Sequence, residues 1–368
     1  MQWQSVQLAD LKNTKRLFSE YKNLDSQVLQ DVINRVESAF ANFTTPDKNG
    51  NRRGKPRFKG KHYYTSLTYP ELSQLDIKKD TQDNTCVNLA KIGLISLVFH
   101  RSLPDGFTVK TGTVIKEADG FYLCLTLEDK SVPVTVAEIP PTEENSLGID
   151  FGLTNYAYLS KGERIENPRF LRIAAQKLAK LQQRLAKKVK FSRPGQILKG
   201  KIARLHQHIA RRRLDFQFKL AYRIFDNCDV LFVEDLKIKN MTRRAQPKIS
   251  NDGSWEHNNQ SAKSGLNKSL LDAAHGQFLD VLKYVAWKLG KNVVEVNPKG
   301  TSQYCWNCLE NVPKDLSDRW HSCSCGQELD RDYNSAKLIK KIGLVSESGG
   351  GTPSLKTALA SGKKKPAP

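Results

Sequence analysis

Four cysteines lie within one 21-residue stretch of the sequence, at Cys305, Cys308, Cys323 and Cys325. Thiolates bind zinc well, and two short knuckles joined by a hairpin can place four sulfurs tetrahedrally around one Zn²⁺. The second pair is spaced C-x-C, which is tighter than C-x-x-C, so His321 is an alternative ligand. Four protein ligands leave no position for water, and we therefore predict a structural zinc site. Unrelated free thiols are the weaker alternative, because the four cysteines are so closely clustered.

Three acidic residues far apart in the sequence stand at the ends of expected structural elements. Asp150 ends the apolar run SLGID, Glu234 ends VLFVE, and Asp332 opens the helical pattern DYNSAKLIKKIG. In an α/β sheet, the ends of neighbouring strands can bring such residues together. Three carboxylates of this kind can hold two Mg²⁺ ions for phosphodiester hydrolysis, one activating the attacking water and one stabilising the leaving oxygen. Singly, each acid could be only a turn residue, a polar strand end or a helix cap, but their joint placement favours catalysis.

The charge of the chain indicates a polyanionic partner. Its 368 residues include 59 Lys and Arg against 38 Asp and Glu, a net charge of +21, which exceeds what solubility requires and is typical of nucleic-acid binding. Residues 169–213 contain 15 basic residues and no acidic one, on a pattern of two amphipathic helices separated by RPG at 193–195. A solvated charged surface is the alternative, but we favour contact with a phosphate backbone. The residues expected to make it are Lys187, Lys188, Arg211 and Arg212.

A second basic segment, residues 45–64, interleaves Lys and Arg with aromatic residues. We predict a loop that leads into a strand and contacts phosphates through Lys55, Arg57 and Lys59. A solvated linker fits the composition equally well.

The remaining elements are expected from periodicity. Residues 26–43 have helical spacing, with Asp25 or Ser26 as the N-cap. Short β-branched and aromatic runs up to residue 137, with a hairpin turn at EADG, predict a small β-barrel or a curled sheet. After a linker at 139–145 the pattern is α/β, with strands in SLGIDFGL, TNYAYLS, FVEDLKI and NVVEVNP and one helix over 269–290. Beyond residue 343 the low apolar content predicts disorder.

The compartment is also constrained by composition. No apolar run approaches the roughly 20 residues that a membrane span needs, and the start of the chain lacks the apolar core of a signal peptide. Cys86, Cys124 and Cys228 stand singly in apolar runs, which indicates buried thiols rather than disulfides. We expect a cytoplasmic protein that makes no membrane contact.

Together these motifs resemble a known family. GIDFGL, FVEDL and DRDYNSAK, with TSQYCWNC and CSCG between the second and the third, resemble the RuvC-like nuclease of the TnpB family, and KGKPRFKGK with SLTYP resembles the start of its wedge domain. TnpB proteins are transposon-encoded, RNA-guided nucleases related to the type V CRISPR effectors. The resemblance covers most of residues 24–343. It implies that Asp150, Glu234 and Asp332 are the catalytic, Mg²⁺-binding acids and that Asp330 only supports them.

The fold implied by the resemblance is α/β plus β, with an RNase H-like (RuvC) nuclease domain behind a small wedge β-barrel. The expected divisions are a helical recognition segment at 1–45 that is short for the family, the wedge at 46–138, the first nuclease part at 139–303 with a basic helical hairpin at 169–226, a zinc ribbon at 304–326, the final nuclease helix at 327–343 and a disordered tail at 344–368.

The function implied is that of an RNA-guided DNA endonuclease associated with the prokaryotic nucleoid. Its expected partners are a guide RNA from its own locus and target DNA, its cofactors are structural Zn²⁺ and catalytic Mg²⁺, and it is expected to be monomeric with its RNA. An unguided RuvC-like resolvase or transposase is less favoured, because the zinc insertion and the large N-terminal nucleic-acid region argue against it. A nuclease-impaired, guide-directed DNA-binding protein, or a simple zinc-ribbon binding module, should have lost one of the acids, and all three are present.

Overall fold

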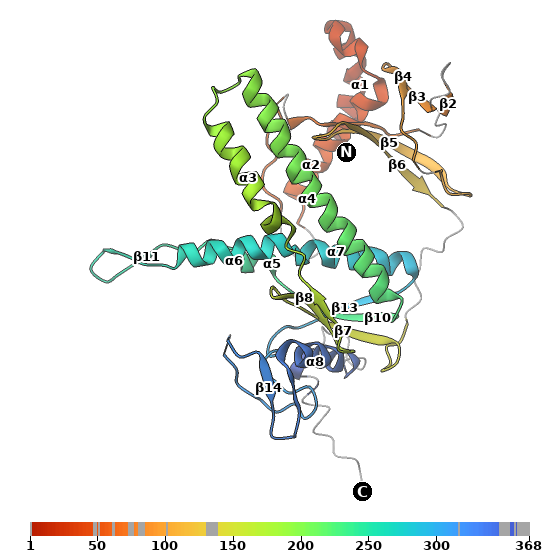
Figure 1. Ribbon diagram of the computed structural model, residues 1–368. Helices are drawn as coiled ribbons and strands as arrows, with labels where there is room; N and C mark the ends of the chain where they lie inside the picture. The colour runs from red at the N-terminus through yellow and green to blue at the C-terminus, as the bar shows by residue number, and fades with distance from the viewer. Residues whose placement is uncertain are drawn as a thin grey trace. The chain divides into compact units, whose positions relative to one another are not determined.

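The computed structural model describes residues 2–46, 50, 52–60, 63–72, 77–79, 85–100, 102–129, 139–315, 317–345, 354–356 and 358. The chain divides into two compact units, Met1–Val134 and Thr135–Pro368, and each is described by itself (Figure 1). None of the helices among the described residues is both long and apolar enough to cross a membrane.

Unit 1 begins with helices and continues with two antiparallel sheets. Its helices are α1 (Gln2–Leu17), the 3-10 helix η1 (Ser19–Asn23) and α2 (Ser26–Thr44). Its strands are β1 (Ser66–Tyr69), β2 (Ile77–Lys79), β3 (Thr85–Leu89), β4 (Gly93–Ser96), β5 (Thr108–Lys116) and β6 (Phe121–Glu128). Helix α2 starts where its sequence predicts, because the Asp25 carboxylate caps it by accepting a 2.8 Å hydrogen bond from the Gln27 amide. Helix α1 lies within the segment 1–45 that was expected to be helical, although periodicity located only the helix over 26–43.

The described strands of unit 1 do not form the single closed barrel that the sequence suggested. They pair as two three-stranded sheets, β1-β5-β6 and β2-β3-β4. The two sheets share one small core that includes Val28, Tyr69, Val87 and Leu89, so side-chain packing joins them where strand pairing was expected. Residues 130–138, assigned to the end of the barrel, lie outside the described part of the chain.

Unit 2 is built on a mixed five-stranded sheet with the order β13-β10-β7-β8-β9. These strands are β7 (Ser146–Phe151), β8 (Asn155–Leu159), β9 (Arg164–Glu166), β10 (Val230–Glu234) and β13 (Asn292–Val296). Strand β10 runs parallel to both β7 and β13, whereas β8 and β9 continue from β7 as an antiparallel meander. Strands β7 and β10 lie in the middle of the sheet and are covered on both faces, which explains why their sequences are almost continuously apolar.

Two long helices follow β9. They are α3 (Phe170–Ala186) and α4 (Arg193–Phe225), which lie side by side as a helical hairpin (Figure 1). Ser192 caps α4 by accepting a hydrogen bond from the Gly195 amide, and Pro194 occupies the first turn, where its missing amide hydrogen costs nothing. The two helices predicted on either side of 193–195 are therefore confirmed.

The single helix predicted over 269–290 is wrong, because the chain breaks it at Ala274. The two observed helices are α6 (Gln260–Ala273) and α7 (His275–Leu289), and Ala274 between them has φ +53°. The carbonyl of Ala274 accepts a 3.2 Å hydrogen bond from the buried side chain of Gln217, which gives the interrupted backbone a partner. A left-handed alanine costs about 1 kcal/mol, and tertiary contacts outweigh that cost here.

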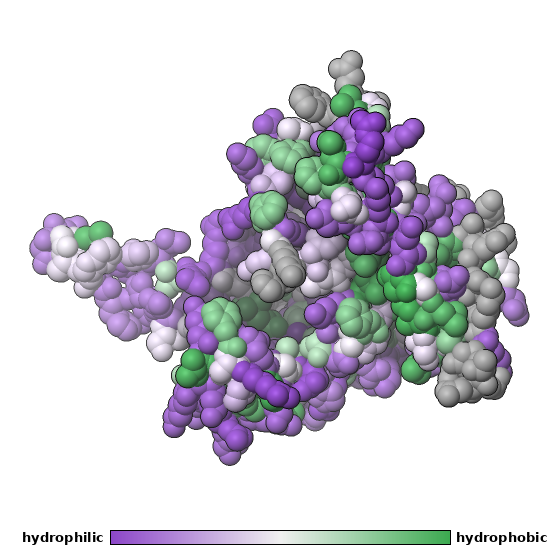
Figure 2. All heavy atoms as spheres, turned by 90° about the horizontal axis from the view of Figure 1, so that it is seen from above, coloured by the Kyte–Doolittle hydropathy of each residue, from purple (hydrophilic) through white to green (hydrophobic). Residues whose placement is uncertain are grey.

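Shorter elements complete unit 2. They are α5 (Ile238–Met241), β11 (Lys248–Ile249), β12 (Trp255–Glu256), β14 (Trp320–Ser322), β15 (Glu328–Asp330) and the last long helix, α8 (Arg331–Val345). The arm that carries β11 and β12 projects from the rest of this unit and has a mainly hydrophilic surface (Figures 1 and 2). Of the tail predicted to be disordered, 354–356 and 358 are described, and there Leu355 and Ala358 are buried in the apolar core below the sheet.

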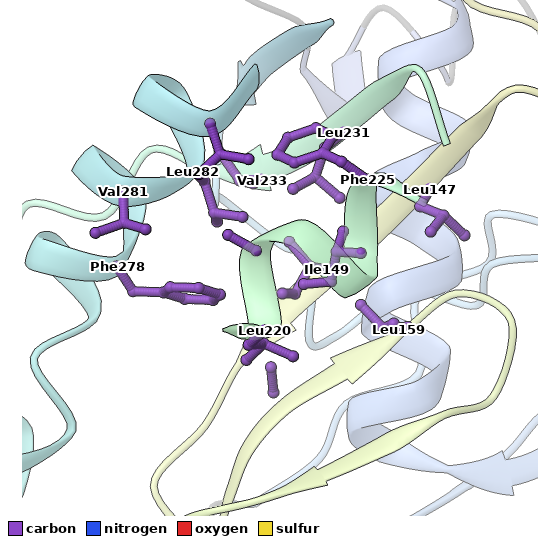
Figure 3. Close-up of a cluster of buried hydrophobic side chains, with 14 of the residues drawn as sticks. Leu147, Ile149, Leu159, Leu220, Phe225, Leu231, Val233, Phe278, Val281 and Leu282 are labelled. Carbon is purple, nitrogen blue, oxygen red and sulfur yellow. The ribbon is translucent and has the colours of Figure 1, made fainter. Parts of the chain in front are cut away.

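The core of unit 2 occupies both faces of its sheet. On one face, side chains of β7, β8 and β10 pack against α4 and α7 (Figure 3). On the other face, β10 and β13 pack against α8. Helix α8 approaches β7 so closely that a Cβ atom added at Gly148 would lie 2.3 Å from the carbonyl oxygen of Ala336. Position 148 therefore tolerates only glycine while α8 keeps its place.

Candidate active site and zinc centre

The alternation of side chains along β10 decides where Glu234 points. Successive strand residues face opposite sides of a sheet. Leu231 and Val233 belong to the core shared with α4 and α7, whereas Val230 and Phe232 belong to the core shared with α8. Glu234 has the parity of Val230 and Phe232, so its carboxylate lies on the α8 face.

The same alternation places Asp150 beside Glu234. On β7, Leu147 and Ile149 face the α4 side, and Gly148 abuts α8, so Asp150 also lies on the α8 face. The parallel register pairs Val233 with Ile149, which makes Glu234 and Asp150 successive neighbours on strands about 4.8 Å apart. Two acids separated by 84 positions in the chain are adjacent in space.

Asp332 joins them from the first turn of α8. It is not the N-cap of that helix, because Asp330 fills that role: its Oδ1 atom accepts hydrogen bonds from the amides of Asp332 at 2.8 Å and Tyr333 at 3.3 Å. The carboxylate of Asp332 is thereby left for the site. Asp150, Glu234 and Asp332 line one cavity of about 490 Å³.

The electrostatics of this cavity suit a bound cation. Burial, then the nearby Glu234 and Asp332 carboxylates, raise the pKa of Asp150 well above its usual range, and Arg331 partly opposes them. Burial also raises the pKa of Glu234, against a hydrogen bond from the Thr301 hydroxyl. A raised pKa means that the ionised carboxylates lack compensating positive charge. Hard oxygen ligands in that condition fit Mg²⁺, which supplies the charge.

Asp235, the neighbour of Glu234, forms an ion pair and does not line the cavity. Its carboxylate pairs with the Nζ atom of Lys237 at 2.6 and 2.8 Å. Asp235 is absent from the residues that line the cavity, as expected for the opposite strand parity.

Sequence reasoning missed three residues of this site. Thr301 is buried and donates its hydroxyl hydrogen bond to Oε1 of Glu234, which fixes that carboxylate. Arg331 places its Nε and a terminal nitrogen 3.4 Å from Oδ1 of Asp332, and Arg319 lines the same cavity. Thr301 and Arg331 stand inside the motifs TSQYC and DRDYN, but nothing in the sequence shows which motif residues contact an acid.

The four predicted zinc ligands come together. The Sγ atoms of Cys305, Cys308, Cys323 and Cys325 all lie within 4.8 Å of one another, with 3.7 Å between Cys305 and Cys325 and 3.5 Å between Cys308 and Cys323. Zn–S bonds of about 2.3 Å in a tetrahedron separate sulfurs by about 3.8 Å, so the cluster fits one Zn²⁺. His321 does not belong to the cluster, and the alternative ligand set is not adopted.

Helix α8 is tied to this cysteine cluster by Asn334. Its Oδ1 atom accepts a 3.1 Å hydrogen bond from the Trp306 amide, and its Nδ2 atom donates a 2.7 Å bond to the Tyr304 carbonyl. The side chain is fully buried, so both bonds are shielded from water. The chain around the first cysteine pair is thereby fixed to the helix that carries Asp332.

Comparisons with known proteins agree with this arrangement. A family model described as "Probable transposase" matches residues 129–245, and one described as "Cas12f1-like, TNB domain" matches residues 275–339. The chain is 32% identical over 325 residues to the "Putative RNA-guided DNA endonuclease InsQ" of Escherichia coli (strain K12), covering 88% of this chain and 75% of that protein. The chain belongs to the TnpB family.

Further relatives extend this result. A "Putative RNA-guided DNA endonuclease" of Streptomyces pristinaespiralis is 29% identical over 352 residues, covering 94% of this TnpB-family chain and 78% of that protein. A solved structure, "Cryo-EM structure of the Cas12f1-sgRNA-target DNA complex", is 15% identical with a TM-score of 0.35, over 92% of this chain and 84% of that one, which is too distant to carry an argument. The residues matched by the two family models include all three acids and all four cysteines of this TnpB protein.

The residues predicted to bind nucleic acid belong to different units. Lys187 and Lys188 are exposed in the turn between α3 and α4, and Arg211 and Arg212 are exposed on α4. Lys55, Arg57 and Lys59 are exposed in the loop that leads to β1 of unit 1, as the sequence of this TnpB protein predicted.

Proposed function

We propose that this TnpB-family protein is an RNA-guided DNA endonuclease whose catalytic centre is formed by Asp150, Glu234 and Asp332. The observation that carries the proposal is their convergence: strand register, strand parity and the first turn of α8 bring all three to one cavity. In this proposal residues 139–303 and 327–343 form an RNase H-like (RuvC) nuclease domain divided by the zinc ribbon at 304–326, and 46–138 form the wedge. The mixed sheet, with a meander followed by two parallel strands, supports that assignment.

Two Mg²⁺ ions held by these acids would supply an activated water and stabilisation of the leaving oxygen. Other residues of the chain hold these acids in position. The Thr301 hydroxyl holds Glu234 in one orientation, and the Asp330 cap sets the start of α8 so that Asp332 enters the cavity. Arg319 and Lys263 line the same cavity and are suited to bind the phosphate of a DNA strand.

In this proposal the zinc ion has a structural role. The four thiolates hold the segment that Asn334 fastens to α8, so Zn²⁺ fixes the position of Asp332 without contacting DNA. The exposed basic residues on the α3–α4 hairpin and in the loop before β1 would contact the guide RNA and the RNA–DNA duplex through phosphates, while base pairing selects the target. The complex would act on the nucleoid as one protein with one RNA.

The test uses protein expressed with its flanking DNA, so that its own RNA is present, and a matched target duplex in Mg²⁺. Asp150→Ala, Glu234→Ala and Asp332→Ala should each abolish cleavage, and their combination should be no worse than one alone, since residues that act as a unit fail together. Asp235→Ala is the matched control, because it removes an acid one residue away that faces Lys237.

Binding of RNA and target is measured in parallel and should survive all four changes. Cleavage by the three variants at the parent's rate would show that the acids do not form the catalytic centre. Retention of a random sample of cellular RNA would overturn the guided part of the proposal, whatever the nuclease result.

A further inference from the structure

A short helical turn near the end of the chain is apolar on one side. The amide of Ala358 donates a 3.2 Å hydrogen bond to the carbonyl of Ser354, which is the bond that closes one turn of an α-helix. Leu355 and Ala358 are buried, whereas Lys356 is exposed. Side chains three positions apart share one face of a helix, so the apolar face of this turn rests on the core and its polar face meets water.

Leu355 packs against the segment that connects β13 to the first cysteine pair. A Cβ atom added at Gly300 would lie 2.9 Å from the Cδ2 atom of Leu355 and 3.3 Å from the ring of Tyr304. The leucine therefore touches the backbone at a place that a side chain would otherwise fill. The core that receives Leu355 also includes Tyr304, so one side chain of the tail contacts both the start and the end of this segment.

The segment forms a turn that orients Glu234. The amide of Gln303 donates a 2.9 Å hydrogen bond to the carbonyl of Gly300, and Thr301 lies inside the turn that this bond closes. Thr301 is buried, and its hydroxyl donates to Oε1 of Glu234. Residues 297–303 belong to no helix or strand, so side-chain packing has a large part in holding them. A shift of this turn would move the hydroxyl that holds the carboxylate.

We propose that Leu355 is a positioning residue of the catalytic centre. By packing on Gly300 it holds the turn from which Thr301 orients Glu234. This role rests on the proposed function, and it adds to the nuclease a segment that lies outside every motif recognised in the sequence. Leu355 does not line the cavity of the three acids, so it acts through the turn and not on DNA.

The first measurement is the single-turnover rate of cleavage in Mg²⁺, with the full chain, its own RNA and a saturating matched target. Leu355→Ala should lower this rate by roughly 10-fold to 100-fold, because a displacement of about 1 Å in a catalytic group can cost about 100-fold. Affinity for the target should stay that of the parent. Leu355→Met keeps the volume of the side chain and should restore the rate. Lys356→Ala is the matched control, because Lys356 is exposed in the same turn.

A second control separates positioning from loss of stability. Val230 is buried in the same core as Leu355 but stands at the opposite end of β10 from Glu234. Val230→Ala should lower the unfolding temperature, as Leu355→Ala does, because both changes remove apolar packing. At a temperature where both variants are folded, Val230→Ala should cleave at the rate of the parent. Equal rates for the two variants would show that Leu355 contributes packing only and would overturn the proposal.

A double-mutant cycle tests the route from Leu355 to Glu234. Thr301→Val removes the hydroxyl that holds Glu234 and should lower the cleavage rate by itself. If Leu355 acts through that hydroxyl, Leu355→Ala should cause no further loss in the Thr301→Val background. Losses that multiply would mean that the two residues act independently, and the proposed route would be wrong.

Hydrogen exchange gives a result that does not depend on cleavage. In Mg²⁺-free buffer, the amide of Gln303 should exchange roughly 10-fold faster or more in Leu355→Ala than in the parent, because exchange reports the opening of the turn. Val230→Ala should leave it unchanged. If the parent did not cleave DNA, the proposed function would fail, and exchange would still decide whether Leu355 holds the turn. Parent-like cleavage by Leu355→Ala, or parent-like exchange at Gln303, would overturn the proposal and leave the nuclease assignment standing.

Discussion

His275 provides a quantitative test of how the cavity that the three acids line is built. This residue opens α7, is only 4% exposed and lines the cavity of the three acids. Its ring stacks on Phe151, the residue after Asp150, with 5.2 Å between ring centroids and 18° between planes. Its Nε2 atom has no hydrogen-bond partner among the described residues. A charge on this imidazole would therefore be buried against aromatic rings.

The magnitude follows from the pKa. Burial lowers the pKa of His275 to about 4, partly opposed by a backbone hydrogen bond at Tyr156. In the unfolded chain the pKa of this histidine is about 6.5. Between pH 6.5 and pH 4, the unfolded chain therefore binds a proton at His275 that the folded protein does not bind. The stability due to neutral His275 is complete above pH 6.5 and is lost as the pH falls to about 4. At about 1.4 kcal/mol per pH unit, the loss reaches about 3 kcal/mol.

The assay is urea unfolding in Mg²⁺-free buffer at steps between pH 7 and pH 4. His275→Gln and His275→Phe should each remove this part of the pH dependence. Asp150 and Glu234 act in the opposite direction, since a raised carboxyl pKa favours the folded state at low pH, but they are unchanged in all variants and cancel in the comparison. His257→Gln, which changes an exposed histidine, should retain the dependence of the parent.

Parallel loss of stability in the parent and in both His275 variants between pH 7 and pH 4 would mean that His275 is protonated in the folded protein. The cavity wall would then be more open to water than the packing indicates.

Three further predictions test other parts of unit 2. Gly148→Ala should destabilise unit 2 by about 1–3 kcal/mol and abolish cleavage, because the new Cβ meets the Ala336 carbonyl and displaces α8; thermal unfolding and cleavage assays check both effects. Asp272→Asn should cost about 1–3 kcal/mol without abolishing Mg²⁺-dependent cleavage, since the Asp272 carboxylate caps α3 and pairs with Arg213; equal unfolding midpoints for parent and variant would refute this. Cys308→Ser should lower zinc from one ion per chain and reduce soluble yield, and elemental analysis of the parent without zinc would contradict the proposed metal centre.

Local sequence signals predicted much of the fold because they act over a few residues. The Asp25 cap, the EADG turn and the start of α4 at 193–195 each depend on side chains within one turn of the backbone. At the break, the Ala274 carbonyl is bound instead by Gln217, which is 57 positions away, and the nearby Gly276 lies inside the first turn of α7 and not at the break itself. A continuous helix was therefore the natural prediction.

The candidate site was predictable in its members but not in its construction. Carboxylates at strand ends and paired cysteines are recognisable from residue type and spacing alone. The different roles of the residues in DRDYN cannot be recognised in this way, because all of them are polar. Asp330 caps helix α8, Arg331 pairs with Asp332, Asp332 enters the cavity, and Asn334 binds the segment that carries the first cysteine pair. Only the direction of each side chain on α8 distinguishes them.

The order of the three acids along the chain has a consequence for synthesis. Asp332 follows Asp150 by 182 residues, and at about 5–20 residues per second the ribosome needs about 9–36 s to pass from one to the other. Unit 1 precedes Asp150 in the chain, and the basic α3–α4 hairpin is synthesised within that interval, whereas helix α8 does not yet exist. Under the proposed function, a nascent chain would carry its basic nucleic-acid-binding surfaces before its catalytic centre, and a chain released early by a ribosome would lack that centre.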